Sequence, residues 1–167
     1  MDRTEKIIVS AVVAALMIAG AGLFLFSLAE PKLKADADNT KCVSNLKMLG
    51  LAMLLYANDN QMWLPDSNGA AGLNQTVQYG GNAQIFFCPA TKSRYLYQGG
   101  IFPPACDSPS STPLIWEPNF PHDGKKNVVF LDGHCEGVSP AEWGSVSPNT
   151  KKAVKLSKQR AGAGGSK

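Results

Sequence analysis

An uncharged, apolar run near the N-terminus constrains this chain more than any other feature. Residues 7–29 form a stretch of 23 residues without a charge, rich in Ala, Val, Leu, Ile and Phe. As an α-helix this run would be roughly 35 Å long, enough to cross the ~30 Å hydrocarbon core of a bilayer with some tilt. We therefore predict a transmembrane signal anchor over residues 7–29, preceded by a short flank over residues 1–6.

Two alternatives to a retained anchor remain open. Ser27 and Ala29 place small residues where signal peptidase requires them for cleavage after Ala29. The apolar region of a cleavable signal usually has only about 7–15 residues, which favours the anchor. A buried core helix is the third reading. Basic residues flank the run on both sides, so the positive-inside rule does not decide its orientation.

A second helix is predicted over residues 40–58. Cys42, Leu46, Leu49, Met53 and Tyr56 recur at spacings of four and three residues, which is one face of an α-helix. Further leucines, at 51, 54 and 55, widen the apolar surface, so we expect this helix to be deeply packed. The glycine at position 50 predicts a close approach by another element. Because proline interrupts helices, Pro31 and the polar residues after it predict a juxtamembrane linker over residues 30–41.

The remaining segments predict loops and short strands. Residues 66–121 are rich in Gly and Pro, with strand candidates at 84–88, 95–97 and 113–116. The strongest signal is a hairpin, in which Asp132-Gly133 joins the strands 127–131 and 134–138 through a predicted type I′ turn. We therefore expect one folded domain over residues 42–149.

The net charge of +3 comes from the C-terminal tail. All six ionisable residues after Glu142 are basic, whereas the rest of the chain has 10 basic and 13 acidic residues. Because Lys, Gly, Ala and Ser dominate residues 150–167, we expect a disordered basic tail. Such a tail either keeps the protein soluble or binds anionic lipid, polysaccharide or nucleic acid.

Three elements of the sequence resemble a known family. The segment from Cys42 to Pro65, the element Phe86-Phe87-Cys88-Pro89, and His122 followed after nine residues by Asp132-Gly133 come in the family's order. Together they resemble type IV pilin-like and type II secretion pseudopilin-like proteins of the planctomycete kind, over residues 42–138. The resemblance implies an α+β, pilin-like fold, in which a long N-terminal helix packs on a small antiparallel sheet. It also implies a place in type II secretion or pilus-like machinery.

The chain departs from that family at the prepilin site. Family members usually carry a glycine followed by a short apolar run with glutamate at the fifth mature position. Residues 7–29 contain no acidic residue. The resemblance therefore predicts the fold, and it leaves prepilin processing and polymerisation open.

The four cysteines, at positions 42, 88, 106 and 135, all follow the apolar run and form no CxxC pair. An even number of cysteines suits two disulfides in an oxidising compartment, with three possible connectivities. We favour Cys42 with Cys88, joining helix to sheet, and Cys106 with Cys135, joining the long loop to the final hairpin. Four reduced thiols in a cytosolic domain are the alternative.

Candidate chemistry centres on His122, Asp123, Asp132 and His134. His122 and Asp132 flank the strand 127–131, which would keep them some 15 Å apart at ~3.3 Å per residue. We therefore interpret Asp132-Gly133 as turn residues and expect His122 to form local hydrogen bonds near Pro121 and Gly124. A cation site or an acid–base pair would require these side chains to converge. We predict no catalytic, cofactor-binding or metal-binding residues.

The sequence thus predicts a non-enzymatic, single-pass protein of the cell inner membrane, with its C-terminal domain periplasmic or extracellular. Its expected partners are pseudopilin-type subunits, in a homo- or hetero-oligomer, or membrane proteins of the secretion machinery. The alternative is a solitary membrane-tethered module that binds anionic surface polymers through its basic tail. An enzyme that uses a metal ion held by His122, Asp132 and His134 is the third class.

Overall fold

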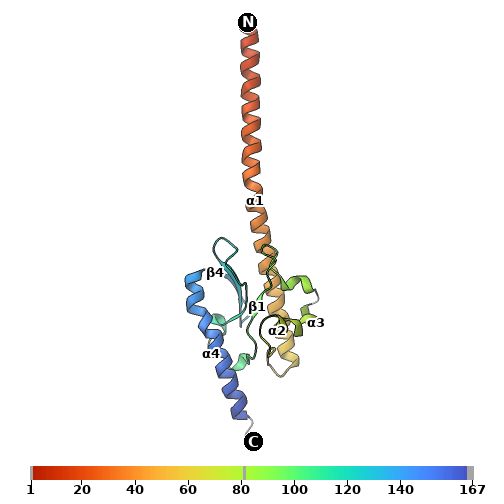
Figure 1. The fold of residues 1–167 in the computed structure, drawn as a ribbon, viewed down its shortest axis with the longest axis vertical. Helices are drawn as coiled ribbons and strands as arrows, with labels where there is room; N and C mark the ends of the chain where they lie inside the picture. The colour runs from red at the N-terminus through yellow and green to blue at the C-terminus, as the bar shows by residue number, and fades with distance from the viewer. Residues whose placement is uncertain (1, 81, 165–167) are drawn as a thin grey trace. The chain divides into compact units, whose positions relative to one another are not determined.

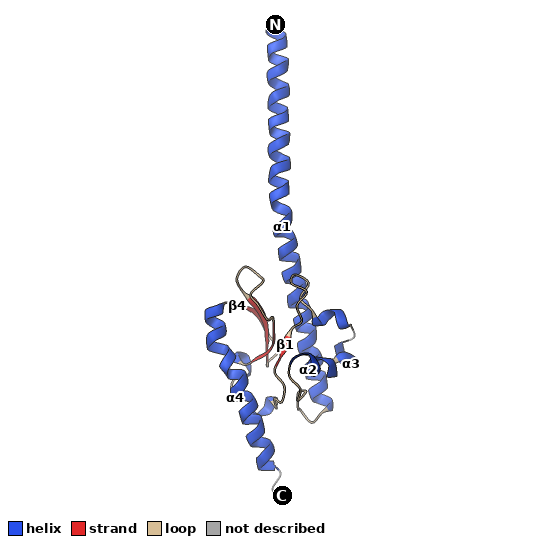
Figure 2. Cartoon of the chain, viewed as in Figure 1, coloured by secondary structure: helices blue, strands red, loops and turns tan. Residues whose placement is uncertain are grey.

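The computed structural model describes residues 2–80 and 82–164 of the 167-residue chain. The protein is α+β, with an apolar N-terminal helix and a four-stranded antiparallel sheet (Figures 1 and 2). Its helices are α1 (Arg3–Asp59), α2 (Gly69–Gln75), α3 (Val77–Gly80) and α4 (Pro140–Gly164). Three 3-10 turns are η1 (Ala83–Phe86), η2 (Pro103–Ala105) and η3 (Pro109–Ser111). The strands are β1 (Leu96–Tyr97), β2 (Pro113–Trp116), β3 (Lys126–Phe130) and β4 (Cys135–Val138).

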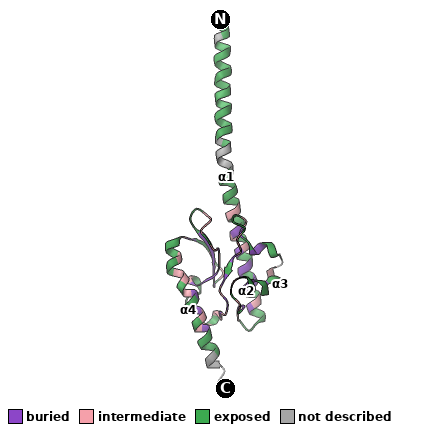
Figure 3. Ribbon diagram, viewed as in Figure 1, coloured by how far each residue is buried: buried purple, intermediate pink, exposed green. Residues whose placement is uncertain are grey.

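The chain divides into two compact units, Met1–Ala37 and Asp38–Lys167. The first contains the helical segment Arg3–Phe24, which is long and apolar enough to cross a membrane. Apolar side chains in this segment, such as Ile8, Leu16 and Phe24, are exposed. Figure 3 shows this part of α1 in green, the colour of exposed residues.

The predicted break at Pro31 is wrong. Helix α1 runs through this proline, and the residues expected to form a linker over 30–41 are helical. A proline removes one backbone N–H donor from a helix. The residues after Pro31 include Lys, Leu and Ala, which favour helix, and they continue the hydrogen-bonded spiral.

The sheet of the second unit has the strand order β1-β2-β3-β4, and each neighbouring pair is antiparallel. The predicted strand at 113–116 is confirmed. The predicted strand at 84–88 is wrong, since it contains the 3-10 turn η1. The side chain of Asn82 accepts a hydrogen bond from the N–H of Gln84 and so caps this turn. The short helices α2 and α3 also occupy a region that the sequence predicted to be loop.

The predicted hairpin is confirmed, but its turn differs from the type I′ prediction. Only Gly133, at φ +90°, has a positive φ among the residues joining β3 to β4. The N–H of Gly133 donates to the Phe130 carbonyl, and the N–H of Phe130 donates to the His134 carbonyl. This pattern is a type I turn followed by a left-handed glycine, so Asp132 keeps an ordinary right-handed backbone.

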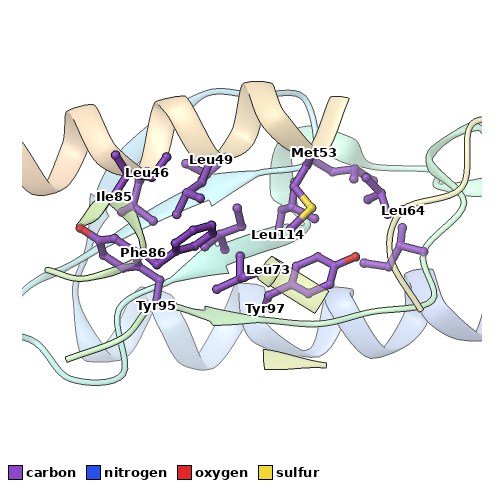
Figure 4. Close-up of a cluster of buried hydrophobic side chains, with 14 of the residues drawn as sticks. Leu46, Leu49, Met53, Leu64, Leu73, Ile85, Phe86, Tyr95, Tyr97 and Leu114 are labelled. Atoms are coloured by element: carbon purple, nitrogen blue, oxygen red, sulfur yellow. The ribbon is translucent and has the colours of Figure 1, made fainter. Parts of the chain in front are cut away.

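The C-terminal part of α1 packs against one face of the sheet. Its buried side chains include Leu46, Leu49 and Met53 of the predicted stripe, which lie near Leu114 of β2 (Figure 4). A Cβ at Gly50 would lie 3.0 Å from the Val129 Cγ1 atom, which confirms the predicted close approach.

The expectation that this helix is deeply packed is wrong. Leu51, Leu54 and Leu55 lie on its outer side, where Leu51 is 58% exposed. Helix α1 therefore buries one stripe on the sheet and leaves a second apolar stripe uncovered.

Helix α4 covers the other face of the sheet, and the expected disordered tail over residues 150–167 is wrong as far as Gly164. Residues 165–167 lie outside the described part of the chain. Val128 and Phe130 of β3 pack with Trp143 and Val146 of α4.

A capping box starts α4. The N–H of Ser139 donates to Glu142 Oε2 at 2.8 Å, and the N–H of Glu142 donates to Ser139 Oγ at 3.4 Å. Farther along, Thr150, Ala153 and Ser157 are buried at helical spacing. Because this stripe consists of small and hydroxylated residues, it was not apparent from hydrophobicity.

Candidate functional site

Four side chains of metal-binding types meet inside the second unit. The ligand atoms of Cys42, Cys88, Glu117 and His122 all lie within 4.8 Å of one another. Both cysteines are fully buried, and the side chains of Glu117 and His122 are only 1% and 7% exposed. We call these four residues the buried cluster.

Two of the four come from α1 and from the loop after η1. Cys42 is a member of the stripe that α1 buries on the sheet. Cys88 begins a tight loop, in which its N–H donates to the Ser93 carbonyl at 2.9 Å and its carbonyl accepts from the N–H of Lys92 at 2.8 Å. The positive φ of Lys92, 58°, closes this loop and holds the Cys88 thiol against α1.

Glu117 directly follows β2, and its carboxylate has a fixed orientation. The N–H of Asn127 donates to Glu117 Oε2 at 2.7 Å. The other oxygen, Oε1, lies 2.9 Å from His122 Nε2. One carboxylate oxygen is therefore held by the backbone of β3, while the other points into the cluster.

His122 is placed by a small hairpin before β3. It exchanges two backbone hydrogen bonds with Lys125, at 3.1 and 2.9 Å. The turn residues Asp123 and Gly124 both have positive φ, 50° and 75°. The predicted local hydrogen bonds of His122 are thus made by its backbone, and its ring is directed into the cluster.

The sulfur atoms complete the geometry. Cys42 Sγ and Cys88 Sγ lie 2.7 Å apart, and Cys88 Sγ lies 3.8 Å from His122 Nε2. All four cysteines of the chain are free thiols, so neither predicted disulfide is formed in this structure. Cys106 Sγ lies 3.3 Å from Thr112 Oγ1, and Cys135 is the first residue of β4.

Burial disfavours the thiolate form of Cys42 and of Cys135. It raises the pKa of Cys42 well above its ordinary value, and the neighbouring Cys88 thiol raises it further. Burial also raises the pKa of Cys135 to about 11. The raised pKa means that the Cys42 thiol is favoured over its thiolate.

The other predicted residues lie apart from the buried cluster. Asp132 and His134 pair with each other beyond the far end of β3, with Asp132 Oδ1 2.6 Å from His134 Nδ1. The His134 ring stacks on Phe130, with centroids 4.5 Å apart. Desolvation raises the pKa of Asp132, but hydrogen bonds from the His134 side chain and backbone N–H outweigh it, and the net pKa is lowered.

Glu117 was not predicted from the sequence, and Cys42 and Cys88 were not predicted to lie beside His122. The available signal was the position of an acidic residue directly after the apolar strand 113–116. Such a residue either ends the strand at the surface or carries a buried charge. Glu117 has the second role because the chain folds back after β2 and brings His122 and Asn127 into hydrogen-bond contact with its carboxylate.

A second feature is the outer apolar stripe of α1, formed by Met48, Leu51, Leu54 and Leu55. Each of these side chains is 42–58% exposed. Their spacing places them side by side on the helix. Contiguous exposed apolar surface of this kind marks interaction sites.

A third feature is a basic stripe on α4. Lys151, Lys155 and Lys158 are exposed and recur at spacings of four and three residues, which places them on one side of the helix. Lys152 lies outside this stripe and pairs with Asp107 at 3.4 Å.

Comparison of the chain with protein-family models, with curated proteins and with solved structures finds no match. The residues and their geometry therefore carry the functional argument.

Proposed function

We propose that this chain is a non-enzymatic, membrane-anchored, pilin-like subunit of a type II secretion or pilus-like assembly. The observation that carries the proposal is the outer apolar stripe of α1. Its exposed apolar side chains lie on the same helix as the membrane-spanning candidate Arg3–Phe24. Its partners would be other pseudopilin-type subunits, or secretion-machinery proteins, that pack along α1.

The division of α1 into two stripes supports this role. Cys42, Leu46, Leu49 and Met53 are buried against the sheet, so they are not available to a partner. The outer stripe has no partner within the described residues of this chain that covers it, and four large apolar side chains in water are unfavourable. A neighbouring helix in a bundle would bury them, as the membrane would bury the segment Arg3–Phe24.

In this role residues 3–24 are retained as an anchor in the inner membrane, and the second unit lies in the periplasm or outside the cell. The arrangement of a long helix on a small antiparallel sheet supports the pilin-like assignment. In the family, an acidic residue in the membrane span helps to align neighbouring subunits. The apolar run of this chain has no acidic residue, so packing along α1 would have to align the subunits instead.

Site-specific photo-crosslinking in membranes tests this proposal. A photoreactive residue replacing Leu51 in the full-length chain should give a ladder of crosslinked subunits after irradiation. The matched control is the same residue in place of Ser145, an exposed position on α4. Only monomer from position 51, or equal ladders from both positions, would contradict packing through α1.

Polar substitution of the same stripe provides a second readout. Leu51→Ser with Leu55→Ser should weaken assembly strongly and change the free energy of unfolding of the subunit little, because both side chains are exposed. Loss of folding in this variant would show that the stripe belongs to the subunit's own core, and would contradict its role in assembly.

The basic stripe of α4 favours a second candidate function, a solitary tethered module that binds anionic surface polymers. Three lysines on one side of a helix form a local positive surface on a chain whose other charges, 13 basic and 13 acidic, sum to zero. Salt-sensitive retention on an anionic polysaccharide should then be lost in Lys151→Gln with Lys155→Gln and Lys158→Gln. Equal retention of the variant would exclude this role.

A further inference from the structure

We propose that Cys42, Cys88, Glu117 and His122 bind one divalent metal ion, of which Zn²⁺ fits best, and that this ion fastens α1 to the sheet. The four residues are distant in sequence and come from four different segments. They supply two thiolates, one imidazole nitrogen and one carboxylate oxygen.

This donor set suits zinc. Structural Zn²⁺ sites are tetrahedral, with Zn–S distances of about 2.3 Å and Zn–N or Zn–O distances of about 2.0–2.2 Å. Such a tetrahedron requires neighbouring ligand atoms to lie roughly 3.4–3.8 Å apart. The separation of Cys88 Sγ from His122 Nε2, 3.8 Å, already meets this requirement.

Two of the other separations have to lengthen, and the remaining ones, which reach up to 4.8 Å, have to shorten by up to about 1 Å. The two sulfurs, at 2.7 Å, would move apart by about 1 Å, and the carboxylate and imidazole, at 2.9 Å, by about half that. Side-chain rotations at Cys42 and Cys88 can provide this movement, since each thiol is carried by a single rotatable bond.

The surrounding hydrogen bonds prepare the ligands. The N–H of Asn127 occupies Glu117 Oε2 and leaves Oε1 as a monodentate ligand. The hydroxyl of Tyr95 donates to the Cys42 carbonyl at 3.4 Å and so supports the first residue of the site. Outer contacts of this kind are a regular feature of metal sites, because they fix ligand orientation.

A disulfide between Cys42 and Cys88 would need a smaller movement of the two sulfurs, from 2.7 Å to about 2.0 Å, but it involves only two of the four side chains. It would use the two sulfurs and give no role to the convergence of Glu117 and His122 on them. The fully buried Glu117 carboxylate is held by the Asn127 N–H and by His122 Nε2, and a cation at Oε1 would compensate its charge further. A divalent cation gives all four side chains a common partner.

The binding reaction balances without an oxidant. Each thiol releases one proton to solvent and forms one metal–sulfur bond, and the neutral imidazole and the carboxylate donate lone pairs. The ion stays divalent. Four protein ligands fill a tetrahedron and leave no open position, so the site would have a structural role.

Co²⁺ titration of the reduced, full-length protein in detergent tests the site. Wild-type protein should bind one equivalent, with the intense visible bands of tetrahedral cobalt and thiolate charge-transfer absorption, and added Zn²⁺ should remove both. Cys88→Ser and His122→Ala should weaken binding at least about a hundredfold, because each removes a ligand.

The chain provides matched controls. Cys135→Ser and His134→Ala remove a cysteine and a histidine outside the buried cluster, so both should bind cobalt as wild type does. Equal binding by the cluster variants and the control variants would overturn the proposal, as would no binding by wild type.

X-ray absorption of the zinc-loaded wild-type protein tests the same ligands without any substitution, in case a cluster variant fails to fold. We expect two sulfur and two nitrogen or oxygen scatterers, at about 2.3 Å and 2.0–2.2 Å. A ligand shell without sulfur would overturn the assignment. So would a Cys42–Cys88 disulfide in protein whose thiols are alkylated at the moment of cell lysis.

Discussion

The protein contains two histidine–carboxylate pairs, one beyond each end of strand β3, and the same chemistry has different consequences at the two ends. His122 and Glu117 are 2.9 Å apart and almost completely buried. His134 and Asp132 are 2.6 Å apart, and their side chains are 40% and 35% exposed. The shorter contact is the one in solvent.

The difference between the two pairs shows that burial, more than contact distance, decides what such a pair can do. Water screens the exposed pair and can replace either partner, so its contribution to stability is small. The buried pair has no such replacement, and it also lies beside two thiols. One pair stabilises a turn, while the other belongs to a site.

Removing the carboxylate should lower the free energy of unfolding far more in the buried pair than in the exposed pair, and this is the largest difference we expect. Glu117→Ala leaves His122 Nε2 and the Asn127 N–H without their partner in the interior, which should cost about 3 kcal/mol of unfolding free energy. Asp132→Ala should cost about 1 kcal/mol or less. Urea unfolding of the full-length chain with a chelator present, followed by tryptophan fluorescence, measures both. Similar losses at the two ends would contradict the role given to burial.

The two glycine turns beside β3 should, in contrast, respond alike. Gly124 and Gly133 both have positive φ, 75° and 90°, and a Cβ at either would meet open space. Alanine should therefore cost about 1 kcal/mol at each position, since only backbone strain is added. Thermal unfolding of Gly124→Ala and Gly133→Ala checks this. A much larger loss at Gly124 would mean that the buried cluster depends on the exact path of its hairpin.

The smallest expected effect is the pH dependence of the exposed pair. The net pKa of Asp132 lies below its ordinary value of 3.8, so ionised Asp132 stabilises the fold above that pH. The contribution should disappear as the pH falls through the lower, folded-state pKa.

The difference in unfolding free energy between wild type and Asp132→Asn, measured in steps from pH 6 to pH 2.5, should therefore shrink below about pH 4. A difference that stays constant over this range would show that folding does not lower the pKa of Asp132, which would contradict a stabilising contact with His134.

The sequence predicted those parts of the fold in which local pattern and tertiary packing agree. The stripe from Cys42 to Met53 marked the buried side of α1, and Asp132-Gly133 marked the hairpin between β3 and β4. The spacing of the apolar residues is enough to predict the buried side of the helix, and the Asp-Gly dipeptide is enough to predict the hairpin.

The prediction failed where tertiary contacts overrule the local pattern. Helix α4 buries Thr150 and Ser157 through specific hydrogen bonds, to the Pro113 carbonyl and from the Phe102 N–H, so its packing face has no hydrophobic signature. The capping box Ser139–Glu142 was the available clue. The buried cluster could not be found from spacing, because its four residues meet only after β2 and β3 have paired.

Native mass spectrometry of the full-length chain, extracted from membranes without reductant or chelator, tests most directly whether the buried cluster is a metal site. We predict the mass of the chain with one zinc ion added and two thiol protons lost, and the same result for Cys135→Ser but not for Cys88→Ser. A chain without metal that is lighter by two hydrogen atoms, with Cys42 linked to Cys88, would contradict it.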